Sequence, residues 1–530
     1  MDLWKAATAP VRGIAWLVGK AREWWLQERA EVEAAYEKEI QILRDRLSRA
    51  TDEADRADIE REIREAEDAY MEYLRAKVVT MSRGVVRDRT PTSVVLIESR
   101  HLPPGEGAAL ERAASTWAAL EPPRTLEERL ILGNAFHMAG DFERSLVEYD
   151  AALDLRPGDP DALTGRGMIL LHLEREEEAV DAFQRSLAAR PDDPDALDSL
   201  GCALSFLGRH AEALQVHNRA LDVRPDEPTA LYNRGLTLYA LSRYEEALAD
   251  YSRSLELRPG HAATLNNRGT TSHALGRYED AVADYNRSLD LRPHDPETLN
   301  NRAAALARLG RYEDGLADVN RSLELQPDDP AALNNRGATL HGLKRYEEAL
   351  ADYDRCLELR PDHPGILSNR GDILRHLNRY EEAVADLNRS LELQPDDSDT
   401  LMNRGAALHE LNRYEEALAD YSRSLELAPD DPATLSNRGL TLYGLCRYEE
   451  ALADFNRALE LRPGDAGTLY NRACASSLLS RYEEAFADLR EAIAGDGKYR
   501  RVAREDEDFE GLRNDPEWGP KFWELVGTEE

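Results

Sequence analysis

Residues 330–363 read PAALNNRGATLHGLKRYEEALADYDRCLELRPDH, and near copies of this stretch follow one another along most of the chain. The copy that begins at Pro228 reads PTALYNRGLTLYALSRYEEALADYSRSLELRP. A proline returns every 34 residues, at Pro157, Pro191, Pro225, Pro259, Pro293, Pro327, Pro361, Pro395, Pro429 and Pro463. A fixed period of this length indicates a solenoid, in which stacked copies of one small unit share a core.

Each copy predicts two helices. Asp-Pro pairs such as Asp329-Pro330 place an N-cap carboxylate before a proline at the first helical position. Apolar residues then recur at intervals of three and four, which predicts one apolar stripe per helix. In the copy from Pro228 the first stripe is Leu231, Gly235, Leu238 and Leu241, and the second is Tyr244, Ala247, Leu248, Tyr251 and Leu255.

The turn between the two predicted helices carries residues that tolerate a left-handed backbone. Gly276, Gly310, Asn378 and Asn412 stand at this place. The second helix is expected to end at the recurring proline, because proline lacks a donor and biases the preceding residue away from helix.

The repeated pattern resembles the tetratricopeptide repeat family. The first unit matches at Leu132-Gly133, Phe136, Tyr149, Ala152 and Pro157, while Ser145 stands where the family has alanine. We interpret residues 126–499 as eleven such units. The resemblance implies an all-α, right-handed superhelix of paired helices whose concave groove binds protein segments.

The first 27 residues differ from the repeats. Four of the seven tryptophans lie there, and the first 22 residues carry a local charge of +3. Tryptophan with Lys and Arg on an amphipathic helix is typical of a membrane interface. The alternative interpretation is a helix docked on its own protein or on a sister subunit.

The other flanking regions are expected to be mostly helical. Residues 28–79 predict a helical hairpin or a coiled coil, because two apolar stripes run out of phase, and either form could pair subunits into a homo-oligomer. Residues 80–125 predict a linker and a degenerate capping repeat. Residues 500–530 predict C-terminal capping helices, because an end repeat would otherwise expose its apolar face.

Composition excludes several classes of function. The net charge of −35 argues against a nucleic-acid partner, because neutralising phosphates requires a basic surface. The four cysteines have no short metal spacing and are expected to be reduced and buried. No apolar run approaches the ~20 residues that span a bilayer, so we predict a cytoplasmic protein, with a peripheral location at the membrane as the alternative.

Motifs of catalysis are missing from the sequence. There is no phosphate-binding glycine loop, no dinucleotide glycine pattern, no HExxH and no nucleophile elbow. Pairs such as Glu347-Glu348 recur in nearly every unit, which is typical of a solvated helix N-terminus rather than of a single catalytic pair. We therefore predict no enzyme activity and no cofactor.

One asparagine recurs at the sixth position of eight consecutive units. It lies about 200° around the first helix from the buried leucine two places earlier, so it is expected to face the groove. The ladder resembles the one in the repeats of O-linked N-acetylglucosamine transferases, which implies contact with a peptide main chain. The alternative is that these amides bond to adjacent helices. The residues are Asn233, Asn267, Asn301, Asn335, Asn369, Asn403, Asn437 and Asn471.

Specificity is expected where groove positions differ between copies. Histidines in successive units are expected to stand too far apart for a tetrahedral metal, so no metal ligand is predicted. The variable groove residues are Tyr232, Tyr239, His273, His341, Arg375, His376, His409, Tyr443 and Tyr470.

Two functions follow from these patterns. The first is a non-enzymatic scaffold that binds a peptide or protein segment in the groove, with residues 1–79 forming the oligomer contact. The alternative is a membrane-associated assembly factor that is anchored through residues 1–27.

Overall fold

The computed structural model describes residues 125–527, together with isolated residues between 41 and 49 and between 111 and 118. Apart from these positions, the predicted segments 1–27, 28–79 and 80–125 lie outside the described residues. The chain divides into unit 1, Met1–Thr264, and unit 2, Leu265–Glu530, and each is described by itself.

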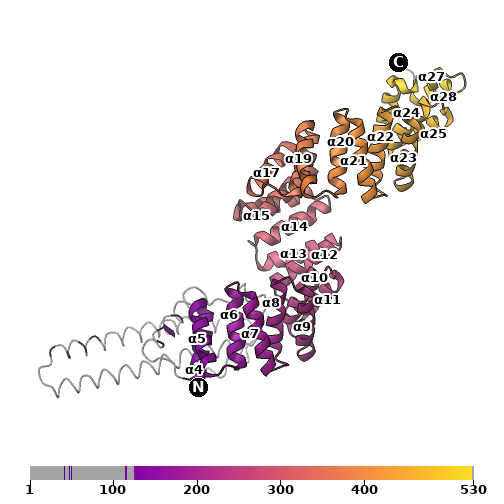
Figure 1. Cartoon of the computed structure of the whole chain (residues 1–530). Coiled ribbons are helices and arrows are strands. Elements are labelled where there is room, and N and C mark those ends of the chain that lie inside the picture. Colours follow the sequence, from indigo (N-terminus) through magenta and orange to yellow (C-terminus); the bar gives the residue numbers. More distant parts are fainter. Residues whose placement is uncertain are drawn as a thin grey trace, which may run out of the picture. The chain divides into compact units, whose positions relative to one another are not determined.

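The described residues form α-helices, one short 3₁₀ helix and no strand, as the sequence predicted. In each unit, successive helices alternate in direction and stack as pairs (Figure 1). Unit 1 holds α4 (Leu126–Ala139), α5 (Phe142–Leu155), α6 (Pro160–His172), α7 (Glu176–Ala189), α8 (Pro194–Phe206), α9 (His210–Val223), α10 (Pro228–Ala240) and α11 (Tyr244–Leu257). The division between the units falls within α12 (Ala262–Ala274).

Unit 2 continues the same alternation and ends in three shorter helices and a 3₁₀ turn. Its helices are α13 (Tyr278–Leu291), α14 (Pro296–Arg308), α15 (Tyr312–Leu325), α16 (Pro330–Gly342), α17 (Tyr346–Leu359), α18 (Pro364–His376), α19 (Tyr380–Leu393), α20 (Ser398–Glu410), α21 (Tyr414–Leu427), α22 (Pro432–Gly444), α23 (Tyr448–Leu461), α24 (Ala466–Leu478), α25 (Tyr482–Gly495), α26 (Lys498–Glu505), η3 (Glu507–Phe509), α27 (Glu510–Asn514) and α28 (Trp518–Val526).

The predicted helix boundaries rest on caps and on left-handed turn residues. The Asp329 carboxylate accepts the backbone N–H groups of Ala331 and Ala332 at 3.1 and 3.3 Å, and thereby caps α16. In the turn after α18, Asn378 has φ 59°, which confirms the left-handed backbone that the sequence predicted there. The other predicted turn residues share it, with φ 74° at Gly276, 73° at Gly310 and 58° at Asn412.

A missing side chain allows the two helices of a repeat to pack closely. A Cβ atom on Gly337 would lie 2.7 Å from the ring of Tyr353, so only glycine admits this buried ring against α16. Tyr353 is 1% exposed, and it packs with Leu333 and Leu340 of the same repeat and Leu367 of the next. The core around Tyr353 therefore extends from one repeat into the next, as in other solenoids.

A two-pronged ion pair also joins the first helix to the second. The Arg336 guanidinium donates to both oxygens of Asp352 at 2.8 and 2.6 Å, and the Asp352 residue is 4% exposed. Such bidentate pairs are among the stronger side-chain interactions. The same pair occurs in eight repeats, at Arg234–Asp250, Arg268–Asp284, Arg302–Asp318, Arg336–Asp352, Arg370–Asp386, Arg404–Asp420, Arg438–Asp454 and Arg472–Asp488.

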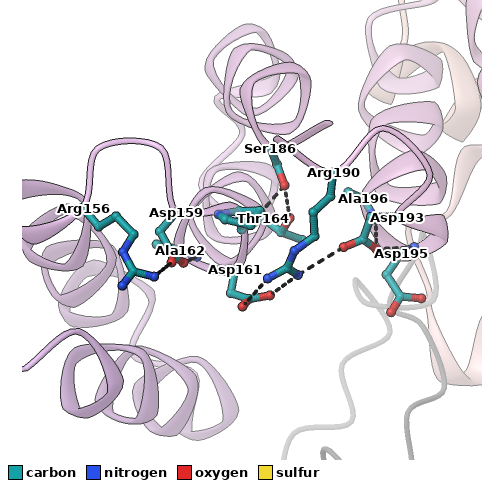
Figure 2. A network of polar contacts seen from close by, with 11 residues as sticks. Arg156, Asp159, Asp161, Ala162, Thr164, Ser186, Arg190, Asp193, Asp195 and Ala196 are labelled. Atoms are coloured by element: carbon teal, nitrogen blue, oxygen red, sulfur yellow. Dashed lines mark hydrogen bonds and ion pairs between the residues drawn. The ribbon is translucent and has the colours of Figure 1, made fainter. Parts of the chain in front are cut away.

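Polar contacts at the loops connect one repeat to the next in unit 1. Figure 2 shows Arg190, at the end of α7, pairing with Asp161 of α6 at 2.7 Å and lying 3.6 Å from Asp193. Asp193 in turn accepts the backbone N–H groups of Asp195 and Ala196, which begin α8. Arg190 therefore links the start of α6, through Asp161, to the start of α8, through Asp193.

The C-terminal end of unit 2 is closed by its own apolar residues. Phe509, Leu512, Phe522 and Val526 are fully buried and pack on Leu489 of α25. Asp515 caps the last helix by accepting the N–H groups of Glu517 and Trp518, each at 2.9 Å.

The cysteines differ from their prediction at one position. Cys202, Cys356 and Cys474 are buried, as expected, but Cys446 is exposed. Cys446 is the left-handed residue of the turn after α22, with φ 58°, and such a turn projects from the core. No helix of the described residues is long and apolar enough to cross a membrane.

Candidate protein-interaction face

The first helices of the repeats carry the predicted ladder, and we call one surface of unit 2 the first-helix face. It consists of the half-buried and exposed side chains of α14, α16, α18, α20, α22 and α24, with α12 from Leu265 onward. Side chains of successive first helices meet at positions 35 or 32 residues apart rather than 34, so each side chain contacts a different position of the neighbouring repeat.

The middle of the asparagine ladder ties each first helix to the one before it. The Asn335 amide donates to the Asn300 oxygen at 2.9 Å, and Asn369 donates in the same way to Asn334 at 3.1 Å. Asn301 repeats the bond to Asn266 at 3.2 Å. Each of these amides thus has a structural role, the alternative that the sequence left open. Each also retains a second N–H and a carbonyl oxygen.

The hydrogen bond from a ladder asparagine to the preceding first helix is missing where a serine stands 35 residues before the asparagine. Asn403 and Asn471 are half-buried and make no side-chain hydrogen bond with another described residue. The residues one register back are Ser368 and Ser436, whose short hydroxyls bond instead to Thr400 at 2.7 Å and Thr468 at 2.9 Å.

The remaining ladder residues vary in their surroundings. Asn437 lies 3.7 Å from the sulfur of Met402, and Asn267 is half-buried and has an interaction within the chain. In unit 1, Asn233 and Tyr232 are 1% and 7% exposed, so both belong to the core rather than to an accessible surface.

A buried polar cluster surrounds Asn233. Its amide donates to Asp198 at 2.9 Å, and Asp198 lies 3.0 Å from the Nδ1 atom of His217. His217 stands where the following repeat has Tyr251, and a Cβ atom on Gly201 would lie 2.5 Å from its imidazole. In this repeat a histidine, His217, thus takes the position of the buried tyrosine, and Asp198 takes the position of the asparagine that accepts the ladder bond elsewhere.

At the C-terminal end, the first-helix face is covered by the chain's own acidic segment. The Tyr470 hydroxyl donates to Asp506 at 2.5 Å, and the Tyr443 hydroxyl donates to Asp508. Tyr470 also stacks on Tyr499, with ring centroids 4.6 Å apart. Two predicted groove tyrosines thus hold a polypeptide segment, although that segment belongs to the same chain.

Burial changes the ionisation of this contact. Burial, together with the hydrogen bond to Asp508, raises the pKa of Tyr443, and the same two causes raise the pKa of Tyr470 next to Asp506. Burial also raises the pKa of the Asp508 carboxyl, although the bond from Tyr443 lowers it. In both hydrogen bonds the tyrosine hydroxyl is the donor and a carboxyl oxygen of the aspartate is the acceptor.

Several variable residues pack against the tyrosine that begins the second helix, five positions later. The His273 ring lies 5.1 Å from Tyr278, and Tyr239 lies 5.3 Å from Tyr244. The other members of this set are His341 on Tyr346, His409 on Tyr414 and Tyr443 on Tyr448. Burial lowers the pKa of His273 and of His409.

The histidine spacing differs from the sequence argument. His341 and His376 are 35 residues apart, and the inter-helix register brings their ring centroids to 5.1 Å. The expectation that histidines of successive units stand too far apart for one metal ion is therefore wrong for this pair. Asp372 lies between them, and its carboxylate accepts a hydrogen bond from Arg375 at 2.8 Å.

Models of the tetratricopeptide repeat match residues 130–194, 226–294, 267–330, 328–396, 396–464 and 437–499, and a further repeat model matches 207–242. These matches together cover more than half of the chain. The chain belongs to the tetratricopeptide repeat family. Tetratricopeptide repeats generally mediate protein–protein interactions, and their scaffolds are typically non-catalytic.

No curated protein matches the chain. Similar solved structures include a hetero-tetramer of APC/C, Cut9-Hcn1, at 14% identity, which covers 78% of this chain and 97% of that one with a TM-score of 0.46. Yeast Tom70 is 15% identical, with coverage of 75% and 99% and a TM-score of 0.36. YrrB, described as a TPR protein with an unusual peptide-binding site, is 26% identical over 35% of this chain and 96% of that one, with a TM-score of 0.29.

The sequence did not single out two sets of residues that the structure brings to the first-helix face. Asp372 stands where the copies on either side have Ala338 and Ala406, and this departure from the pattern could have marked it. Asp506 and Asp508 lie beyond the last repeat and carry no such signal, because only folding of the cap brings them to Tyr443 and Tyr470.

Proposed function

We propose that the protein is a non-enzymatic scaffold that holds a segment of a partner polypeptide against the first-helix face of its tetratricopeptide repeats. The observation that carries this proposal is the acidic segment at Asp506–Asp508, which the side chains of α22 and α24 hold by hydrogen bonds. The first-helix face is therefore chemically suited to bind a polypeptide through side chains alone.

The rest of the face offers further groups for such a contact. Asn403 and Asn471 retain the full hydrogen-bonding capacity of an amide, and the tied asparagines retain part of it. One amide per repeat is compatible with an extended segment, because stacked helices lie ~10 Å apart and a chain rises ~3.3 Å per residue. The variable residues between them would then set which segment binds.

Site-specific cross-linking tests the proposal with a matched pair of positions. Ala338 on α16 and Ala351 on α17 are exposed alanines of the same repeat. A photo-reactive amino acid at 338 is expected to cross-link a host protein, whereas the same group at 351 is expected not to do so. Equal cross-linking from both positions, or cross-linking from 351 alone, would reject the first-helix face as the binding surface.

The homo-oligomer contact assigned to residues 1–79 rests on the sequence. We expect light scattering to give an oligomer for the full chain and a monomer for a chain that begins at Leu102. The same mass per chain for both would reject this contact.

The membrane alternative rests on the tryptophans and positive charges of residues 1–27. If this segment binds lipid, the full chain should float with vesicles of anionic lipid and a chain that begins at Glu28 should not. Equal flotation of the two chains would reject the membrane anchor and would leave protein binding as the proposed function.

A further inference from the structure

A cluster of three metal-ligating side chains lies on the first-helix face between α16 and α18. His341 and Asp372 approach to 3.7 Å, and His376 and Asp372 approach to 3.8 Å, in each case between the Nε2 atom and a carboxylate oxygen. The ligand atoms of all three residues lie within 4.8 Å of one another. We propose that His341, Asp372 and His376 form a binding site for a divalent transition-metal ion of the zinc class.

The distances agree with the geometry of zinc. Zn²⁺ bonds to imidazole nitrogen and carboxylate oxygen are ~2.0–2.2 Å long, so tetrahedral donors stand about 3.3 Å apart. The two nitrogen–oxygen separations exceed this value by only a few tenths of an ångström, which rotation of the His341 and Asp372 side chains can close. Two imidazoles and one carboxylate are also a donor set that zinc uses when it keeps a fourth position open.

The backbone fixes the three ligands on two helices. Asp372 and His376 are four residues apart on α18, so their side chains lie on one face of that helix. His341 comes from the last turn of α16, and the 35-residue register brings it against His376. The His376 ring stacks on Tyr346 with centroids 4.8 Å apart and planes 1° apart, which limits its rotation.

The site is accessible from solvent. The side chains of His341, Asp372 and His376 are 34%, 18% and 31% exposed. The other two candidate clusters are less suitable. Asp198, Cys202 and His217 are all buried, and the Asp506 and Asp508 of the third cluster already accept the tyrosine hydroxyls.

Arg375 is the group that a metal ion would have to displace. Its guanidinium donates to Asp372 at 2.8 Å and lies 3.2 Å from the Nε2 atom of His376. Its positive charge therefore lies beside two of the groups that would bind the metal ion. Removal of Arg375 should leave the three ligands in place and remove this competitor.

Titration of Zn²⁺ into the full, untagged chain tests the site after treatment with a chelator. We expect one ion per chain, and we expect His341→Ala, Asp372→Asn and His376→Ala each to weaken binding by about tenfold or more. His409→Ala is the matched control, because His409 occupies on α20 the position that His341 occupies on α16, but it bonds to Thr441 at 2.9 Å. Arg375→Ala should bind Zn²⁺ more tightly than the wild-type chain.

Three results would overturn the site. They are the absence of stoichiometric binding by the wild-type chain, an affinity that His341→Ala and His376→Ala leave unchanged, and binding that Arg375→Ala fails to strengthen. Visible absorption of the Co²⁺-loaded chain gives a second readout, because tetrahedral Co²⁺ absorbs far more strongly than the octahedral ion. Circular dichroism of each variant checks that the helices are retained.

Discussion

The middle of the first-helix face and its C-terminal end are built from nearly the same repeat, yet they are covered differently. Around α14, α16 and α18, side-chain amides tie each helix to the one before, and the histidine cluster stays accessible. At α22 and α24, tyrosine hydroxyls bind the chain's own acidic segment, and an apolar cap follows.

The difference shows that the neighbour decides the role of a repeat position. Asn335 is tied because Asn300 lies one register back, whereas Asn403 is untied because Ser368 lies there. The eight arginine–aspartate pairs, in contrast, lie within single repeats and recur without change from Arg234–Asp250 to Arg472–Asp488. In these eight repeats the ion pair inside the repeat is therefore constant, whereas the contacts between repeats depend on the residues of the neighbouring repeat.

The largest effect is expected from removal of the cap's core. Phe509 is 0% exposed, and Phe509→Ala should cost about 3–5 kcal/mol of cap stability because it leaves a cavity. Hydrogen exchange should accelerate in α24 and α25 and stay unchanged in α16 and α17, since each repeat contacts only its neighbours. Trp523→Ala is the control, because Trp523 is 36% exposed and should have little effect. Faster exchange throughout unit 2 would show that the two regions unfold together.

A second change should affect both regions alike. Arg336→Ala and Arg472→Ala each leave a buried aspartate without its bidentate partner, and each should cost about 3 kcal/mol. Urea unfolding followed by hydrogen exchange at each repeat measures both. If the cost at Arg472 were much the smaller, the cap would be supporting the last repeat in place of the ion pair.

A third comparison concerns the tied and untied amides. Asn301, Asn335 and Asn369 changed together to Ala should lower stability, since each lost hydrogen bond is worth ~1 kcal/mol and the gain in helix propensity offsets only about half of that. Asn403→Ala with Asn471→Ala should leave the melting temperature level or raise it, because no ladder bond is lost. A loss of stability in the double variant equal to that in the triple variant would mean that the ladder bonds are not what stabilises the middle.

The smallest expected effect is the pH dependence that Asp508 adds at the C-terminal end. The raised pKa of Asp508 means that the folded cap favours the protonated carboxyl. Its contribution to stability is therefore full below the ordinary carboxyl pKa and is lost as pH rises through the raised value. Asp508→Asn should protect η3 and α24 more than the wild type does near neutral pH, and the difference should vanish in acid. Hydrogen exchange at two pH values measures this, and an equal difference at both would remove the carboxyl as its cause.

The sequence alone was sufficient for the repeat and its helices. The recurring proline, the capping aspartates and the left-handed turn residues are local signals, and each acts within a few residues of its position in the chain. Glycine at 337 and tyrosine at 353 likewise predict close packing of the two helices, because both belong to one repeat. The sequence also placed the asparagine ladder on the first helix, but left open whether it contacts a ligand or a helix.

The tertiary structure decided which side chains of different repeats meet. A 34-residue period suggests that equivalent positions face each other, whereas side chains of the stacked first helices meet at positions 35 or 32 residues apart. That offset pairs Asn335 with Asn300 and His341 with His376, and no local pattern encodes it. The cap's contact with Tyr443 and Tyr470 has the same origin, because it depends on where a segment folds back and not on the residues beside it in the chain.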